Sequence, residues 1–313
     1  MSTWLERLRH IGATPVPTPP GPRQWAELLE RLRVARSERG NLKATDLQAL
    51  EAALGRAIAT DQLQLLYQPR IDTLSGRIVG AEALLRWQHP DLGLLQPAQF
   101  IPYAEETGVI LPLSRWVLRH ACAQMAQWDV QGLPKIAISV NLTPHQLSDP
   151  DLCSDALHIL NDYGLQSARL ELEVSEPMLN LDSAKALQTL RKLRSARIGI
   201  TLDDFGIGYT SLSHLEEFPI DVVKIDSSMI ANVPGDYADE AMIQAIIDAG
   251  RRLRIRVVAK GVEKLGQVQF LRQRRCDDMQ GFFFSEALPA LGFAQRVQRD
   301  RTSADAKPAN SSN

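Results

Sequence analysis

Cysteine is scarce in this sequence, with only Cys122, Cys153 and Cys276 among 313 residues. They lie far apart and form no paired CxxC motif, so they predict neither a disulfide framework nor a zinc site. The six histidines show no metal-ligand spacing either, and we expect core or surface roles for them. The cysteine usage favours a protein of the reducing cytoplasm.

Long apolar runs and an excess of one charge are also absent. No stretch approaches the ~18 apolar residues of a membrane helix, and the first residues carry charges where a signal peptide is apolar. We therefore expect no membrane insertion. The 35 Lys and Arg residues nearly balance 37 Asp and Glu residues, and the basic run at 251–256 lacks the interleaved aromatic residues of a nucleic-acid surface. No nucleic-acid partner is expected, so any anionic ligand must be held by a local group of side chains.

The composition divides the chain into three parts. Residues 1–42 contain a segment rich in Pro and Thr between two short amphipathic helical patterns, one of which places Trp25, Leu28, Leu29 and Leu32 on one face. We expect these helices to pack on the domain, on a twin subunit or on a protein partner, and the segment is too short for a sensory or cyclase domain. Residues 43–297 are expected to form one domain, and residues 298–313 a disordered tail.

Within the domain, short apolar runs alternate with helical stretches, which predicts a parallel α/β fold. The gap between the first two runs is too short for a crossover helix and contains a Ser-Gly turn, so that pair should be antiparallel. Eight runs favour a TIM-like (βα)8 barrel with one antiparallel strand. The predicted strands are 63–68, 78–85, 136–141, 170–173, 198–203, 222–225, 257–260 and 279–283.

Three helices have predicted amino-terminal caps. Ser114 is expected to cap a helix through Trp128, Asp182 one through Ala196, and Asp236 one through Leu253.

Polar residues recur at or near the ends of the predicted strands. They are Glu82, Asn141, Glu173, Asp203 with Asp204, Lys224, Lys260 and Gln280. A barrel brings the carboxyl ends of its parallel strands to one face, so these residues are expected to converge on one pocket. Alone, each position is better explained as a helix cap or a solvated side chain. Their repetition at successive strand ends favours a functional site instead.

The carboxylates and the amide oxygen form an oxygen-rich set that suits Mg²⁺ or Mn²⁺ better than zinc. A phosphate-containing substrate is expected, because two such ions about 4 Å apart can activate water and stabilise the leaving oxygen of a phosphodiester.

Several motifs then indicate a family. Glu82-Ala83-Leu84 followed by Leu85-Arg86-Trp87 resembles the signature of the EAL family of cyclic di-GMP phosphodiesterases. Further matches run from Tyr67 to Gly281, and they are 67–69, 100–102, 106–108, 139–142, 173–176, 203–209, 224–226 and 280–281. In that order the motifs are far more specific than the three-letter signature alone.

The resemblance implies roles at the matching positions. Glu82, Asn141, Glu173 and Asp203 would bind one divalent ion, and Asp203 with Asp204 would reach the second. Lys224 would hold the attacked phosphate or its water. Gln68, Leu84, Arg86 and Gln280 would contact the ligand. Glu176 would steady the loop at 204–211, and a homodimer is expected by the same resemblance.

Position 260 departs from the family pattern. The family carries a catalytic glutamate there within Ala-Glu-Gly-Val-Glu, whereas this chain reads Ala259-Lys260-Gly261-Val262-Glu263. An ammonium group can neither accept a proton nor bind a cation, so the second metal site becomes doubtful. Three interpretations remain open: cyclic di-GMP recognition as a signalling receptor without hydrolysis, residual phosphodiesterase activity with a base such as Glu263 that yields pGpG, or a site that binds nothing.

Overall fold

The computed structural model describes residues 24–30, 44–181, 183–206 and 214–305. The predicted cap Asp182 and most of the predicted loop at 204–211 lie outside these residues. No helix in the described part of the chain is long and apolar enough to cross a membrane.

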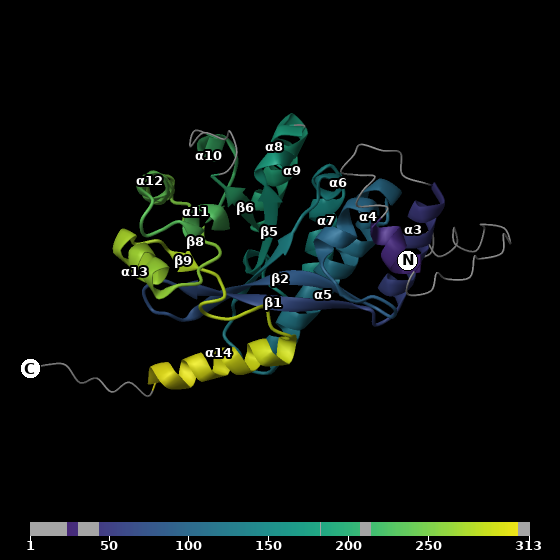
Figure 1. The fold of residues 1–313 in the computed structure, drawn as a ribbon, viewed down its shortest axis with the longest axis horizontal. Helices are drawn as coiled ribbons and strands as arrows, with labels where there is room; N and C mark the ends of the chain where they lie inside the picture. Colours follow the sequence, from purple (N-terminus) through teal and green to yellow (C-terminus); the bar gives the residue numbers. More distant parts are fainter. Residues whose placement is uncertain (1–23, 31–43, 182, 207–213, 306–313) are drawn as a thin grey trace, which may run out of the picture.

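Eight strands close into a mixed barrel, and one short strand is attached to its outside (Figure 1). The reversed strand is β1, which runs antiparallel to both β2 and β9, while β2 and β4–β9 run parallel in series. This confirms the predicted TIM-like barrel with one antiparallel strand. The strands are β1 Leu63–Asp72, β2 Ile78–His89, β3 Gly93–Leu95, β4 Ala137–Asn141, β5 Leu170–Ser175, β6 Gly199–Phe205, β7 Val222–Ile225, β8 Arg256–Ala259 and β9 Asp278–Met279.

Helices cover the outside of the barrel. They are α3 Ala44–Ala59, α4 Ile101–Thr107, α5 Ile110–Val130, α6 Pro144–Leu147, α7 Leu152–Asp162, α8 Glu176–Leu181, α9 Ser183–Ser195, α10 His214–Glu217, α11 Ser227–Ala231, α12 Tyr237–Leu253, α13 Leu265–Arg274 and α14 Ala290–Asp305, with 3-10 turns at Pro97–Gln99 and Ser167–Arg169. Asp236 caps α12 as predicted, since its side chain accepts from the backbone N–H groups of Ala238 and Asp239. Ser114, by contrast, lies inside α5, because the apolar side chains of Ile110 and Leu113 already pack in the core one turn earlier.

The largest differences from the predicted strand lengths concern three strands. The predicted strand 279–283 shortens to Asp278–Met279, because Gly281 packs against Val262 so closely that a Cβ there would lie 2.2 Å from the Val262 backbone oxygen. In contrast, β1 and β2 extend beyond their predicted ends, because their nine residue pairs form one long antiparallel ladder.

The carboxyl-terminal helix continues past the predicted domain end at 297. Phe293 anchors α14 on the barrel by stacking on Trp128 with ring centroids 4.8 Å apart, and α14 lies against β1 (Figure 1). The helix then runs on to Asp305, supported by the Arg296–Asp300 ion pair and a hydrogen bond from Arg301 to the Gly132 carbonyl. The predicted disordered tail is therefore wrong over 298–305.

The helical segment 24–30 belongs to the packed domain. Trp25 and Leu28 are 2% and 3% exposed within the core. Trp25 packs edge-on against His89, which in turn packs edge-on against Trp87 of β2. The predicted apolar face of this segment thus packs on the domain, at the far end of the strand that carries Glu82.

Candidate functional site at the carboxyl ends of the strands

The predicted strand-end residues gather at one mouth of the barrel. Glu82 lies on β2, Asn141 ends β4, Glu173 lies on β5, Asp203 and Asp204 lie on β6, and Lys224 lies on β7. Lys260 and Gln280 follow β8 and β9 directly, and their backbone N–H groups bond to the carbonyls of Ile225 and Ala259. The backbone ladder therefore fixes both residues at the same level of the barrel.

Glu82 is the centre of a buried hydrogen-bond network. Its Oε1 accepts from Asn141 Nδ2 at 3.0 Å, and its Oε2 accepts from Lys224 Nζ at 2.7 Å and from Gln280 Nε2 at 2.8 Å. The fully buried ammonium of Lys224 also contacts Glu173. The Lys224 ammonium thus lies between two carboxylates, and its role in holding the attacked phosphate or its water stays a prediction.

The pKa values of the two carboxylates around Lys224 are shifted in opposite directions. Burial raises the pKa of Glu82, but the Lys224 ammonium together with Gln280 and Lys260 outweighs burial and lowers this pKa to about 2. Burial and then the charge of Glu82 raise the pKa of Glu173 to about 7. Burial lowers the pKa of Lys224, but the two glutamates outweigh it and leave this pKa raised. Lys224 thus favours the ionised form of Glu82 more than that of Glu173.

Lys260 forms a second cationic centre. Its Nζ lies 2.7 and 2.9 Å from the two carboxylate oxygens of Asp203 and 2.7 Å from Asp204 Oδ1. Burial and then the charge of Lys224 lower the pKa of Lys260, but the carboxylates of Asp203 and Asp204 together outweigh them and raise it. The backbone of Asp204 is left-handed with φ of 54°, a conformation that Asp tolerates better than most residues. The ammonium therefore fills the space between the two aspartates.

The two predicted metal positions differ in how well they suit a divalent ion. At the first, Glu173 is 1% exposed and its Oε2 has no hydrogen-bond partner, and Gln280 Oε1 is also buried without one. Glu82, Asn141 and Glu173 are oxygen donors, so their chemistry fits Mg²⁺ or Mn²⁺, whereas both oxygens of the fourth predicted ligand, Asp203, contact Lys260. At the second, the Lys260 ammonium holds the oxygens that a metal would need, so the residues present do not fit. Among the described residues, no three His, Cys, Asp or Glu side chains form a ready ligand cluster.

The other predicted ligand contacts lie around this centre. Gln68 pairs with Glu82 across the β1–β2 ladder and donates from Nε2 to the Ser285 carbonyl. Leu84 and Arg86 follow Glu82 along β2 and are half-buried, and Arg86 donates to the Leu85 carbonyl. Glu176 begins α8 and is buried. Glu263, the alternative base, is exposed in the segment after Lys260.

A second charged layer lies toward the amino ends of the parallel strands, and it was not predicted from the sequence. Arg70 donates to both oxygens of Glu171 at 2.6 and 2.8 Å, and Asp278 lies 3.5 Å from Arg70 Nε. Gly80 lies against Arg70, and a Cβ at this position would lie 2.8 Å from the guanidinium. The signal was available in the two-residue spacing of Gln68 with Arg70 and of Glu171 with Glu173, since such pairs share one face of a strand.

The family model described as "EAL domain" matches residues 51–287. The cyclic di-GMP phosphodiesterase NbdA of Pseudomonas aeruginosa is 37% identical over 260 residues, which cover 83% of this chain and 33% of the relative. The bifunctional diguanylate cyclase/cyclic di-GMP phosphodiesterase MucR of the same organism is 38% identical over 250 residues, which cover 80% of this chain and 36% of the relative. The chain thus spans about a third of the length of these curated relatives.

Among solved structures, the one described as "PaMucR Phosphodiesterase, c-di-GMP complex" matches with a TM-score of 0.74 and 38% identity. The match covers 78% of this chain and 99% of that chain. The similarity therefore extends over nearly the whole of that solved domain.

Proposed function

Because the chain belongs to the EAL-domain family, we propose that it recognises cyclic di-GMP at the carboxyl ends of its strands and that its hydrolysis is impaired or lost. On this proposal the protein acts as a cytoplasmic receptor in second-messenger signalling. The observation that carries the proposal is the position of the Lys260 ammonium between Asp203 and Asp204.

The charge of Lys260 opposes catalysis in two ways. An ammonium with a raised pKa cannot accept a proton from water, and loss of general-base help typically slows a reaction by about 10²- to 10⁴-fold. The same positive charge repels a divalent ion at the second position by several kcal/mol, even at an effective dielectric constant of about 20.

Ligand recognition is supported by the residues that remain. The site keeps Gln68, Arg86, Lys224 and Gln280 at the family positions, and Lys260 adds a cation near the place where a bridging phosphate would lie. Relatives described as cyclic di-GMP phosphodiesterases, and a solved relative in complex with c-di-GMP, support the same ligand class. If the first position binds Mg²⁺ or Mn²⁺, its donors would be Glu82, Asn141, Glu173 and Asp203.

Phosphodiesterase activity is the second candidate. It is favoured by the oxygen donors at the first position and by Lys224. The experiment that separates the two incubates the purified protein with labelled cyclic di-GMP and Mn²⁺, measures binding at equilibrium, and analyses the nucleotide afterwards. Saturable binding with intact nucleotide supports recognition. Efficient formation of pGpG supports the phosphodiesterase, and no binding at all contradicts both.

A further inference from the structure

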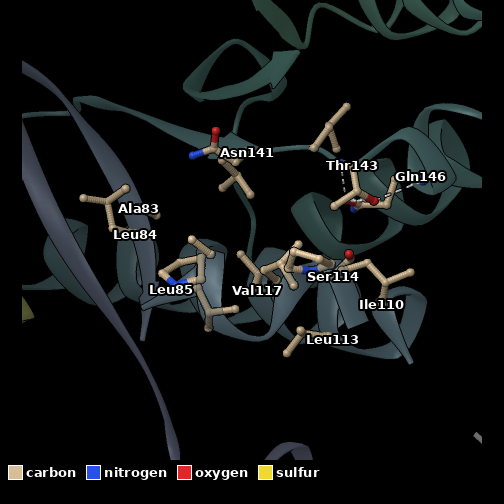
Figure 2. Close-up of a pocket in the computed structure, with 16 residues that line it drawn as sticks. Ala83, Leu84, Leu85, Ile110, Leu113, Ser114, Val117, Asn141, Thr143 and Gln146 are labelled. Carbon is tan, nitrogen blue, oxygen red and sulfur yellow. Dashed lines mark hydrogen bonds between the residues drawn. The ribbon is translucent and has the colours of Figure 1, made fainter. Parts of the chain in front are cut away.

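The barrel has a second face, at the amino ends of its parallel strands. Figure 2 shows a pocket beside Leu84 and Asn141 that lies at the opposite face, with the carboxylate centre. Helices α9, α12 and α13 end at the amino-end face, because they lead directly into β6, β8 and β9. The turn at 73–77 between β1 and β2 lies there too, since β1 is reversed.

Side-chain hydrogen bonds join these segments into one surface. Arg251 of α12 donates to the carbonyls of Arg274 and Arg275 at the end of α13, and the two helices lie side by side (Figure 1). Arg272 of α13 donates from Nε to the carbonyl of Thr73 in the turn. The ends of α12 and α13 and the turn are therefore direct neighbours.

The end of α9 joins the same surface through Asp221, which precedes β7. Its carboxylate pairs with Arg194 of α9, and its carbonyl accepts from the backbone N–H of Arg256, the first residue of β8. Exposed arginines occur in all of these segments. We call them the arginine face, and they are Arg77, Arg197, Arg252, Arg254, Arg272 and Arg275.

Three arginines of this face occupy backbone positions that normally favour glycine. Arg197, Arg254 and Arg275 follow α9, α12 and α13 with φ of 62°, 60° and 59°. A Cβ strains this left-handed conformation, so helices very commonly end on glycine there. The chain itself uses glycine after α5 and α7, at Gly132 and Gly164. The backbone alone thus gives no reason for arginine at the three positions.

The positive charge of the arginine face is largely uncompensated. The acidic side chains around it already have partners, and they are Asp72, Asp221, Glu240, Asp248, Asp277 and Asp278. By contrast, the guanidinium groups of Arg252, Arg254 and Arg275 have no hydrogen-bond or ion-pair partner within the described part of the chain. The whole chain has a formal net charge of -2, so the positive charge is concentrated on this face.

An exposed leucine lies beside these arginines. Leu74 is 83% exposed, and it follows Thr73, whose carbonyl accepts from Arg272. An anionic lipid bilayer offers partners for both kinds of side chain, because its phosphates spread over separate arginines and its acyl boundary accepts a leucine. Nucleic acid fits less well, since the turn at 73–77 and the helix ends at 191–197, 248–256 and 272–275 contain no aromatic residue for base stacking.

We propose that the arginine face binds the surface of an anionic lipid bilayer, with Leu74 entering the boundary between headgroups and acyl chains. The carboxylate centre then faces away from the bilayer, because it lies at the other ends of the same strands. Such adsorption needs no membrane-spanning helix. The inference stands apart from the proposed function, since no part of it involves the nucleotide.

The test is sedimentation of the full chain with vesicles made of phosphatidylglycerol and phosphatidylcholine in equal parts. Vesicles of phosphatidylcholine alone are the neutral comparison. At about 50 mM salt, the affinity for the mixed vesicles should exceed that for the neutral ones at least about 10-fold. At about 500 mM salt this difference should disappear, because salt screens exposed charges.

A glycine triple variant combines Arg197→Gly, Arg254→Gly and Arg275→Gly. It removes three charges and relieves three left-handed arginines, so the midpoint of urea unfolding should stay the same or rise. The affinity for the mixed vesicles should fall at least about 10-fold. Leu74→Ser, in an exposed turn, should lower it at least about 3-fold.

The matched control combines Arg56→Gln, Arg115→Gln and Arg119→Gln. It removes the same charge from exposed positions of α3 and α5, and it should change the affinity for the mixed vesicles far less than the glycine triple variant does.

Three results would overturn the proposal. The first is equal binding to neutral and mixed vesicles, or to neither. The second is a glycine triple variant that keeps its vesicle affinity but loses stability, which would assign the arginines to the carbonyls at the helix ends instead. The third is binding of duplex DNA at about 50 mM salt without binding of the mixed vesicles, which would assign the face to nucleic acid.

Discussion

The Nζ atom of Lys260 lies within 2.9 Å of both carboxylate oxygens of Asp203. The lysine was predicted to stand where the family carries a glutamate, but its partner could not be read from the sequence. In the structure, the lysine neutralises the residue that was expected to serve both metal positions. Two ammonium groups, Lys224 and Lys260, therefore face the carboxylates on which the expected metal chemistry depends.

Nucleotide binding should tolerate removal of divalent ions. Lys260 and Lys224 already supply positive charge at the carboxylate centre, so EDTA is expected to change the affinity for cyclic di-GMP by less than about 3-fold. Isothermal titration in EDTA and in MgCl₂ measures this. A loss of binding in EDTA would show that a metal, rather than the lysines, holds the phosphates.

Replacing Lys224 by methionine should strongly destabilise the barrel. Glu82 and Glu173 would lose a buried cation, and breaking a buried ion pair costs about 3–5 kcal/mol. Urea unfolding gives the free energy, and Mn²⁺ should recover part of the loss if it occupies the first position. Arg115→Met is the control, because the Arg115–Asp155 pair is exposed and such pairs contribute about 0–1 kcal/mol. Equal effects of the two variants would contradict the role of Lys224.

Trp25→Ala should destabilise the whole domain, because this side chain is almost fully buried against His89. Removing a core Trp costs about 3–5 kcal/mol. Glu27→Ala, on the exposed side of the same segment, should change the free energy of unfolding by less than about 0.5 kcal/mol. A Trp25→Ala protein as stable as the wild type would mean that segment 24–30 does not pack on the domain in solution.

His89 should make stability depend on pH. Burial lowers its pKa, while Asp91 raises it and Arg56 lowers it. A group whose pKa is lowered by folding contributes stability above its unfolded pKa, about 6.5, and loses it as the pH falls. His89→Asn keeps a side-chain acceptor for the Asp91 N–H and removes the titration.

The readout is the slope of the melting temperature between pH 8 and pH 5, compared between the wild type and His89→Asn. The comparison is needed because Glu173, with its raised pKa, changes stability in the opposite direction over this range. The wild type should lose more stability on acidification than His89→Asn. Equal slopes in the two proteins would contradict the role of His89.

The features that could be predicted from the sequence are those encoded locally. Alternation of apolar runs with helices predicted the barrel, and the short gap before Ile78 predicted the reversed strand. Polar residues at strand ends indicated the site, because the topology itself brings them together. The pairing of Lys224 with Glu82 depends on side-chain conformations across the barrel, so strand-end position alone could not give it.

Other features depended on packing between distant segments. The extension of α14 beyond residue 297 is supported by stacking of Phe293 on Trp128 and by the Arg301 contact with Gly132. The early start of α5 depends on burial of Ile110 and Leu113. Neither the packing of α14 nor that of the first turn of α5 can be predicted from the local sequence, in which Ser114 has the residue type of an amino-terminal helix cap.

The most direct test of the account compares turnover by the wild type, Lys260→Glu and Lys260→Gln with cyclic di-GMP and Mn²⁺. The account predicts that the wild type binds the nucleotide and leaves it intact. Lys260→Glu, which restores a carboxylate, should form pGpG at least about 10²-fold faster, and Lys260→Gln, which only removes the charge, should gain far less. Efficient cleavage by the wild type, with no gain in Lys260→Glu, would contradict the account.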